Sequence, residues 1–413
     1  MKRSPLLPIF LVVLVDVLGF TIVYPLLPFY AEEFDATPLI ATTLVSVYAL
    51  CSLLSTPVIG RLSDQFGRRR LLLLSQAGTC IGFLVLGFAQ ALWMLFLGRI
   101  LDGLTAGNLS VAQAYISDHT EPQNRTKAFG VIGVAFGIGF TIGPGMAGIL
   151  SDHGQRPHVP FLVAAGLSLG SMVCSYTLLE PGVPAKAADE AAGPAGKRPG
   201  LFDFATYLEY FRRPGLGSLY LQFFLFCFSF TAFMSGFALF AERRFAWTAR
   251  EVGYMFMYSG FLGIILQGGI LGRLVKKMGE AKLALAGFVA AVAAYATLGF
   301  AQTVVMLVIA ATIAAFGNGV LRPVITSELS QRIPRHEQGV AIGITGSLNS
   351  LAMIVAPPIG GALIDHHWLF AWTLVPGAAA VIGLVVLLTT RSQVAAAKRA
   401  VTAASAAPPI AGA

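Results

Sequence analysis

The sequence predicts an all-α integral membrane protein in which twelve transmembrane helices form two pseudo-repeated bundles of six. Of the 413 residues, 56% are hydrophobic and only 12% are charged, whereas a soluble domain carries about 25% charged residues. Apolar runs long enough to cross a bilayer recur along the whole chain, and two stretches of the first half recur in the second half. These three observations exclude a soluble protein.

Each predicted span is an apolar run of about 20 residues, the length that a helix needs to cross the hydrocarbon of a bilayer. Most runs are rich in Gly and Ala, which allow helix backbones to approach closely in lipid. In span 1, Pro25 and Pro28 predict a kink near the outer end. The runs cover residues 6–30, 38–60, 70–90, 92–116, 127–150, 159–179, 216–241, 250–271, 281–301, 303–327, 339–363 and 368–390.

The distribution of Lys and Arg predicts the orientation, because these residues remain on the cytoplasmic side of membrane proteins. With a cytoplasmic N-terminus, 22 of the 28 basic residues fall in cytoplasmic segments and four fall in outer loops. We therefore predict a multi-pass protein of a cell membrane, most simply a bacterial inner membrane, with both termini in the cytoplasm. This distribution also explains the net charge of +8 without a nucleic-acid partner.

The span pattern is interrupted once, by "PGVPAKAADEAAGPAGKRPG", whose Pro, Gly, Ala and charged residues are typical of a linker. We predict an N-terminal bundle over residues 1–180, a cytoplasmic linker over 181–214 and a C-terminal bundle over 215–390. Residues 391–413 are rich in Ala and are predicted to form a disordered cytoplasmic tail.

The two halves of the chain repeat each other. "GRLSDQFGRRRLLL" at 60–73 aligns with "GRLVKKMGEAKLAL" at 272–285, and "PGMAGILSDH" at 144–153 aligns with "PPIGGALIDH" at 357–366. The two offsets differ by a single residue although the matches lie far apart. Repeated membrane halves with a binding site between them are typical of transporters, so a small-molecule substrate is expected.

Three motifs extend this interpretation: "GRLSDQFGRR" (60–69) between spans 2 and 3, "LGRILDGLTAGN" (97–108) in span 4 and "GIGFTIGPGMAG" (137–148) in span 5. They resemble, in the same order, three signatures of the major facilitator superfamily, in its twelve-span drug:proton antiporter branch. Within that branch the chain looks most like the tetracycline-efflux-type transporters. The resemblance covers about residues 8–390, and it implies the major facilitator fold and proton-coupled efflux of drug-like molecules.

The chain departs from this family pattern at several positions. Gln65 stands where the loop motif usually has Arg or Lys, and the span-5 motif ends in Ala147 rather than in a pair of glycines. Tetracycline pumps typically carry acids inside spans 3 and 9, and the matching positions here are Gly82 and Ala291. The resemblance therefore implies efflux without implying that tetracycline is the substrate.

Asp16 is an acid at the centre of the apolar stretch "LVVLVDVLGFTIVYPLLPF". An ionised carboxylate at the bilayer centre costs about 2.5–3.5 kcal/mol on insertion scales, and intramembrane acids therefore face a cavity, find a partner or mark a proton pathway. We predict that Asp16 takes part in proton coupling. A structural carboxylate that is hydrogen-bonded to a neighbouring helix is the alternative.

Span 4 carries a second pair of intramembrane charges, Arg99 and Asp102. Arginine does not lose its proton in proteins, so Arg99 needs a partner, and Asp102 lies within one helical turn. We predict that Arg99 is exchanged between Asp102 and Asp16 during proton coupling; a static Arg99–Asp102 pair is the alternative. At 100° per residue, one polar stripe of span 4 contains Arg99, Asp102, Gly103, Ala106, Ser110 and Gln113.

The substrate is expected to meet aromatic walls with few polar groups, because flat hydrophobic ligands bind such cavities. Span 7 is unusually rich in Phe, although Phe that only faces lipid is the alternative explanation. The predicted cavity residues are Phe20, Tyr24, Ala106, Ser110, Gln113, Gln222, Phe226, Phe233, Gln267, Asn318 and Asn349.

Two further motifs predict conformational roles. The loop motif and its neighbours predict a latch that holds the halves together when the cavity faces outward, since Asp64 and Asp118 are not needed for topology; arginines that only follow the positive-inside rule are the alternative. The latch residues are Gly60, Asp64, Gly67, Arg68, Arg69, Asp118 and Arg125. In span 5, Gly139, Gly143, Pro144 and Gly148 predict close helix packing with a kink; the family resemblance implies that this packing seals a leak path.

Proton-coupled or facilitated uptake of a sugar or organic acid remains an alternative function on the same fold. A membrane-embedded enzyme is disfavoured, because the chain lacks an H-E-x-x-H motif and a Walker loop. Its G-x-S-x-G match, around Ser168, falls inside span 6 rather than on a strand-to-helix turn. The spacing of the four Cys and six His indicates no metal site, so no cofactor is expected, and we expect a monomer.

Overall fold

The computed structural model describes residues 6–120, 125–151, 158–179, 204–213, 215–333 and 337–406, and the regular secondary structure of these residues is helical. A π-helical segment, Leu266–Ile270, joins α12 to α13. The helices are α1 Leu6–Val23, α2 Leu27–Glu32, α3 Pro38–Phe66, α4 Arg68–Gly87, α5 Leu92–Leu104, α6 Asn108–His119, α7 Arg125–Leu150, α8 Val159–Leu178, α10 Phe204–Arg212, α11 Leu216–Phe245, α12 Ala249–Ile265, α13 Leu271–Gly299, α14 Val304–Arg332, α15 Gln338–Asp365 and α16 Leu369–Ala406.

Every predicted span corresponds to a helix or to a pair of helices. Nine helical stretches of the described residues are long and apolar enough to cross a membrane, and one of them, Ala249–Gly299, contains both span 8 and span 9. Span 1 consists of α1 and α2, and span 4 consists of α5 and α6. The prediction of an all-α membrane protein is confirmed.

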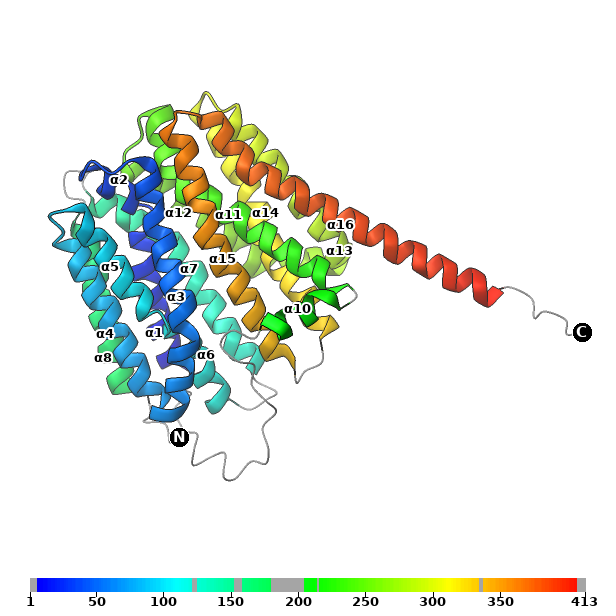
Figure 1. Ribbon diagram of the computed structural model, residues 1–413, viewed down its shortest axis with the longest axis horizontal. Coiled ribbons are helices and arrows are strands. Elements are labelled where there is room, and N and C mark those ends of the chain that lie inside the picture. Colours follow the sequence, from blue (N-terminus) through cyan, green and yellow to red (C-terminus); the bar gives the residue numbers. More distant parts are fainter. Residues whose placement is uncertain are drawn as a thin grey trace, which may run out of the picture.

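The helices fall into two groups that lie side by side. Helices α1 to α8 occupy one side of the molecule, and α11 to α16 occupy the other (Figure 1). The groups meet where α3 packs on α15 and where α7 packs on α12. We call the two ends of the molecule the α2 end and the α10 end, after the short helices that mark them in Figure 1.

The internal repeat is visible in the backbone. Gly67, between α3 and α4, has φ 93° and ψ 141°, and Gly279, which the repeat aligns with it, has φ 76° and ψ 154°. This conformation is accessible without strain only to glycine. Both glycines therefore make the same turn between the second and third spans of their halves.

Span 1 breaks where its prolines predict. Helix α1 ends at Val23, residues 24–26 form a turn that contains Pro25, and α2 begins at Leu27. Pro28 lies in the first turn of α2, where proline is tolerated because its missing N–H has no partner there.

Span 4, in contrast, is not the single helix that the sequence predicts, because residues 105–107 are not helical. Hydroxyl groups of α3 and α4 bind the backbone of this break. Thr56 donates to the Ala106 carbonyl over 2.8 Å, and Ser75 donates to the Thr105 carbonyl and accepts from the Gly107 N–H over 3.2 Å. Unpaired backbone groups cost several kcal/mol in lipid, so these hydroxyls make the break tolerable. The predicted polar stripe is therefore interrupted at Ala106.

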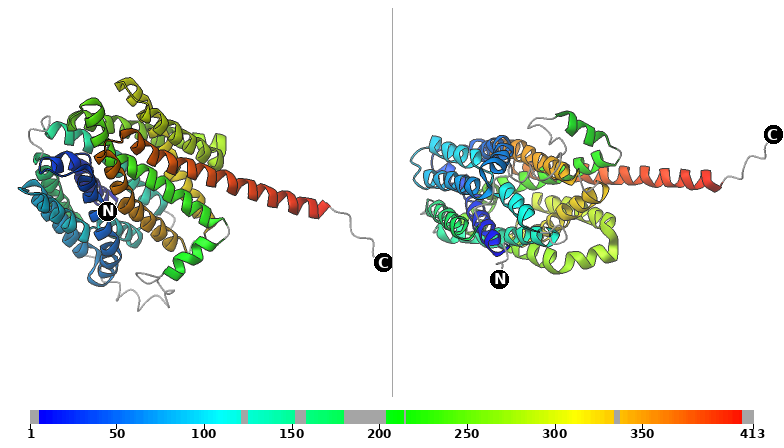
Figure 2. Two further views of the ribbon diagram at one scale, coloured as in Figure 1. Left: turned by 45° about the horizontal axis from the view of Figure 1, so that its top comes forward. Right: turned by 90° about the horizontal axis from the view of Figure 1, so that it is seen from below.

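Two predicted loop segments also differ. Residues 391–406 continue α16 as a helix that projects beyond the bundle (Figure 2), instead of forming a disordered tail. Their Ala-rich sequence contains no Gly or Pro, so it favours helix. The predicted linker contains α10, while residues 181–203 and 214 lie outside the described residues.

Candidate functional site

The two halves are in close contact at the α2 end. A Cβ atom built on Gly361 of α15 would lie 2.0 Å from Thr42 Oγ1 and 2.7 Å from the Pro38 carbonyl oxygen of α3. At the second crossing, a Cβ on Gly253 of α12 would lie 2.4 Å from the Pro144 carbonyl oxygen of α7. Both crossings therefore bring backbones as close as glycine allows.

An ion pair joins the halves at the same end. Arg243 of α11 donates to Glu32 of α2 over 2.6 Å and to Glu242 over 3.2 Å. The side chains of Arg243 and Glu32 are 23% and 21% exposed, so water only partly screens the pair.

The same crossing helices are less tightly packed toward the α10 end. A Cβ built on Gly133 of α7, on Gly268 or Gly269 of the π-helical segment, or on Gly343 or Gly346 of α15 meets nothing within 4 Å. These five glycines are exposed. The contact between the halves is therefore concentrated at the α2 end.

Asp16 lies among polar side chains from three other helices. Gln76 of α4, Asn108 of α6 and Ser171 of α8 lie close to its carboxyl group. Gln76 Nε2 donates to Ser171 Oγ over 2.6 Å, and Ser171 donates to the Val12 carbonyl over 3.3 Å. Asp16 itself is partly exposed, so this polar cluster is accessible to solvent or ligand.

Arg99 and Asp102 form a buried ion pair on α5. Arg99 Nη1 donates to Asp102 Oδ2 over 2.9 Å, and both side chains are nearly inaccessible. The guanidinium also lies over the ring of Tyr48, 4.2 Å from its centroid, in a cation–π contact. Asp102 is close enough to Asp16 for their like charges to interact. Exchange of Arg99 between the two acids remains a prediction.

Four partly exposed aromatic rings gather beside this pair. The ring of Phe20 lies 5.6 Å from that of Tyr24, 6.2 Å from that of Tyr48 and 6.5 Å from that of Phe140, measured between centroids. Phe20 and Tyr24 are predicted cavity residues. Sequence analysis missed Tyr48 and Phe140, because they come from α3 and α7 and no local pattern connects these helices with α1.

The other predicted cavity residues are dispersed. Ser110 and Gln113 lie partly exposed on α6, beyond the break that contains Ala106. Asn318 lies near Tyr295, whose hydroxyl has no hydrogen-bond partner among the described residues. Gln267 is exposed on the π-helical segment, and Asn349 contacts Met353 on its own helix.

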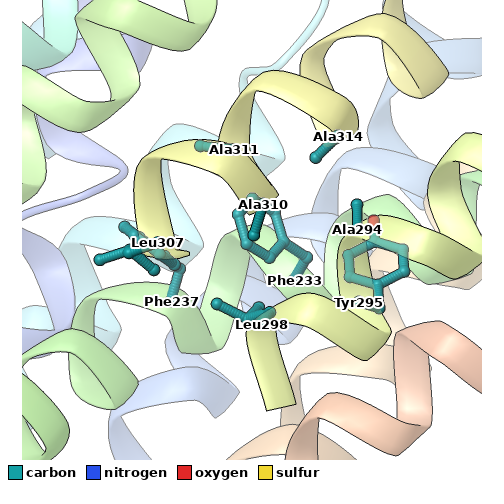
Figure 3. Close-up of a pocket in the computed structure, with 9 residues that line it drawn as sticks. All are labelled: Phe233, Phe237, Ala294, Tyr295, Leu298, Leu307, Ala310, Ala311 and Ala314. Carbon is teal, nitrogen blue, oxygen red and sulfur yellow. The ribbon is translucent and has the colours of Figure 1, made fainter. Parts of the chain in front are cut away.

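The Phe residues of span 7 are mainly core residues. Gln222 is 1% exposed and Phe226 is 5% exposed, and Phe226 belongs to the hydrophobic core of the C-terminal half. Phe233 packs against Tyr295 and Trp372. It also points into a small apolar pocket (Figure 3), which is lined by Phe233, Phe237, Ala294, Tyr295, Leu298, Leu307, Ala310, Ala311 and Ala314.

The predicted latch residues form a cluster within the N-terminal half. Arg68 pairs with Asp64 of α3 and with Asp118 of α6, the latter over 2.9 Å. Arg69 donates to the Tyr176 carbonyl of α8 and lies over its ring. Gly67 supplies the turn described above, and nothing lies within 4 Å of a Cβ built on Gly60. Arg125 begins α7, but its side chain lies outside the described residues.

The span-5 motif packs α7 against α1 and α12. A Cβ on Gly139 would lie 2.5 Å from Val17 Cγ1, and a Cβ on Gly143 would lie 2.0 Å from Thr21 Oγ1. A Cβ on Gly148 would lie 2.9 Å from the Cα of Arg250, next to the contact that Pro144 makes with Gly253. These residues therefore make close helix contacts, which extend to the other half.

Gly82, where tetracycline pumps typically carry an acid, has no room for one. A Cβ on Gly82 would lie 2.9 Å from the Gly98 carbonyl oxygen and 3.1 Å from Asp102 Cβ. Ala291, the matching position in span 9, is buried against Gly317. The two positions therefore serve helix packing in this chain.

Comparison with known proteins agrees with this architecture. The profile of the Major Facilitator Superfamily matches residues 9–301 and 268–411. The chain is 32% identical to the class B tetracycline resistance protein of Escherichia coli over 384 residues, which cover 90% of each protein. It is 26% identical to multidrug resistance protein 2 of Bacillus subtilis over 377 residues, covering 90% of this chain and 91% of the relative.

Solved structures share the fold. The human organic anion transporter MFSD10 (TETRAN) matches with a TM-score of 0.71 at 21% identity, over 93% of this chain and 99% of the other. The nucleoside transporter NupG matches with a TM-score of 0.72 at 11% identity, over 94% and 99%. The chain therefore belongs to the major facilitator superfamily and is a multi-pass membrane transporter rather than an enzyme.

Proposed function

We propose that this transporter exports small hydrophobic or cationic molecules in exchange for protons, by alternating access. The observation that carries the proposal is the partly exposed carboxyl group of Asp16 within a cluster of polar side chains in the N-terminal half. Such a group can take up and release a proton inside the membrane. Similarity to tetracycline and multidrug resistance proteins supports export of drug-like molecules.

In this mechanism the aromatic group of Phe20, Tyr24, Tyr48 and Phe140 provides the substrate-binding wall beside the charges. Protonation of Asp16 removes one of two neighbouring negative charges, and this change favours one orientation of the halves over the other. The membrane potential contributes about 2.3 kcal/mol per charge per 100 mV. A monomer with one site between its halves is sufficient for this cycle.

The orientation follows from the positive-inside rule. Arg68, Arg69 and Arg70 begin α4, at the end of the molecule away from α2 (Figure 1). We assign this α10 end to the cytoplasm together with both termini, in a bacterial inner membrane. The contacts at the α2 end then close the outer side of the transporter. In this state Arg68 binds Asp64 and Asp118 within one half, and we propose that the same cluster engages the other half when the α10 end closes.

The proton-coupling proposal predicts that Asp16→Asn abolishes substrate export against a gradient but leaves movement of the substrate down its own gradient intact. Asparagine keeps the size of the side chain and one acceptor oxygen but cannot carry the proton. Proteoliposomes with an internal pH dye would be tested with a panel of hydrophobic cationic dyes and tetracyclines. A variant that still exchanges protons for substrate at the wild-type ratio would show that Asp16 is not the coupling group.

The latch proposal predicts that Asp64→Asn slows turnover by about tenfold with little change in substrate affinity. Loss of one charge-assisted hydrogen bond to the other half, worth about 1.5–3 kcal/mol, in the state with the α10 end closed changes the rate of interconversion, not the binding site. Turnover in proteoliposomes and equilibrium binding to purified protein measure the two quantities separately. Weakened binding at unchanged turnover would contradict the latch.

A further inference from the structure

The polar cluster around Asp16 contains two carbonyl oxygens without partners. Gln76 Oε1 and Asn108 Oδ1 are both buried, and neither accepts a hydrogen bond from any described residue. The Gln76 side chain is completely buried, between α1, α4 and α8. A buried acceptor that remains unpaired costs about 1–3 kcal/mol, so two of them beside one carboxylate need an explanation.

A proton explains only part of this arrangement. A protonated Asp16 carries a single O–H group, which satisfies one of the two amide oxygens and leaves the other unpaired. A metal cation accepts several oxygen ligands at once, so it would satisfy both amides and the carboxylate together. For this, each amide turns about its terminal C–C bond to bring its oxygen toward Asp16, and Gln76 gives up the hydrogen bond that its Nε2 donates to Ser171.

We propose that Asp16, Gln76, Asn108 and Ser171 form a binding site for a monovalent metal cation of the sodium class, for which the proton competes. The ligand atoms are carboxylate, amide and hydroxyl oxygens, which suit hard cations rather than transition metals. Asp102 is already neutralised by Arg99, so Asp16 supplies a single negative charge. A monovalent ion cancels that charge, whereas a divalent ion would leave a net charge inside the membrane, which is costly.

The surrounding structure supports a cation site. Asn108 begins α6 directly after the break in span 4, and helices broken near their centre are typical of ion sites in transporters. The described interactions of the Asp16 carboxyl include no cationic side chain, and its partial exposure leaves a path for entry. The site contains one acid, so the sequence patterns of His, Cys, Asp and Glu that indicate metal sites do not reveal it.

The role of this ion in transport rests on the proposed function, because the ion and the coupled proton would share Asp16. Binding of the ion to the site does not depend on the proposed function. A sodium gradient would then drive or regulate export through the carboxylate that the proton uses.

The test is thermal unfolding of the full-length protein in detergent, with NaCl, LiCl or KCl against choline chloride at equal ionic strength and pH 8. Sodium should raise the melting temperature by at least about 2 °C, and lowering the pH to 6 should weaken this effect by competition. Gln76→Met, which keeps the shape without the oxygen, should weaken apparent sodium affinity by about tenfold. Gln302→Met removes an exposed amide elsewhere and should leave the affinity unchanged.

The result that overturns the site is a melting temperature that responds equally to sodium and choline, or a sodium effect that is identical in wild type and Gln76→Met. Asp16→Asn separates the two proposals. If the melting temperature of the wild type does not respond to sodium but Asp16→Asn loses proton exchange, the ion site is refuted and the proposed function stands. If Asp16→Asn loses the sodium effect but exchanges protons normally, the proposed coupling role of Asp16 is refuted and the ion site stands. If Asp16→Asn does not fold, the sodium-dependent melting temperatures of wild type and Gln76→Met still test the ion site.

Discussion

Replacement of Arg99 by methionine is expected to destabilise the folded protein by about 3–5 kcal/mol, because it leaves Asp102 buried without its counter-ion. Both side chains are nearly inaccessible, and the pair is the sole hydrogen bond that the structure gives for the guanidinium, whose Nε atom has no partner among the described residues. Thermal unfolding in detergent measures the loss. Arg70→Met removes an exposed arginine and should change stability by no more than about 0.5 kcal/mol.

A double variant separates the charge from the packing. Arg99→Met combined with Asp102→Leu removes both charges, and buried ion pairs replaced by apolar residues often retain stability. We expect the double variant to melt close to wild type and to remain inactive in transport. If Arg99→Met alone melts like wild type, the pair does not stabilise this conformation.

The second large effect is expected for Gly361→Val at the crossing of α3 and α15. The valine would collide with Thr42 Oγ1 and with the Pro38 carbonyl, which lie 2.0 and 2.7 Å from the position of its Cβ. Overpacking costs about 1–3 kcal/mol, and here the cost applies only while the α2 end is closed. Export should therefore fall by about ten- to hundredfold, while the protein remains folded in the other orientation.

Cysteine labelling measures this shift directly. Thr42 is completely buried in the closed α2 end, so a cysteine at Thr42 should react slowly with a membrane-impermeant maleimide, and faster once Gly361→Val is added. Gly170→Val on α8 is the matched control, because nothing lies within 4 Å of a Cβ there. Equal labelling with and without Gly361→Val would contradict the assignment of this crossing as a closed gate.

The tertiary structure explains why sequence reasoning succeeded with some motifs and not with others. The close packing of the span-5 motif could be inferred because Gly139 and Gly143 occur one turn apart, and such spacing permits close helix packing in lipid. The break in span 4 was not predictable, since it depends on Thr56 and Ser75 of other helices. Its local sequence contains Gly103 and Gly107, but glycines are frequent throughout the predicted spans.

The Phe residues of span 7 illustrate the same limit. Their number suggested a binding wall, yet Phe226 belongs to the core, and Phe233 packs on Tyr295 and Trp372. The composition of a helix shows that it is rich in aromatic residues, but it does not show which neighbouring helix these residues contact. The aromatic group that does lie beside the buried charges includes Tyr48 and Phe140, which the chain order separates widely from Phe20.

The sequence by itself determined the membrane location of the spans, their helical structure, the duplicated halves and the presence of Asp16, Arg99 and Asp102 inside the membrane. These properties follow from local composition, because a bilayer imposes the same length and polarity on every span. Only the tertiary structure decided which groups meet: Arg99 with Asp102 and Tyr48, and Asp16 with Gln76, Asn108 and Ser171. Contacts between helices depend on rotation and crossing, and no local sequence pattern encodes these.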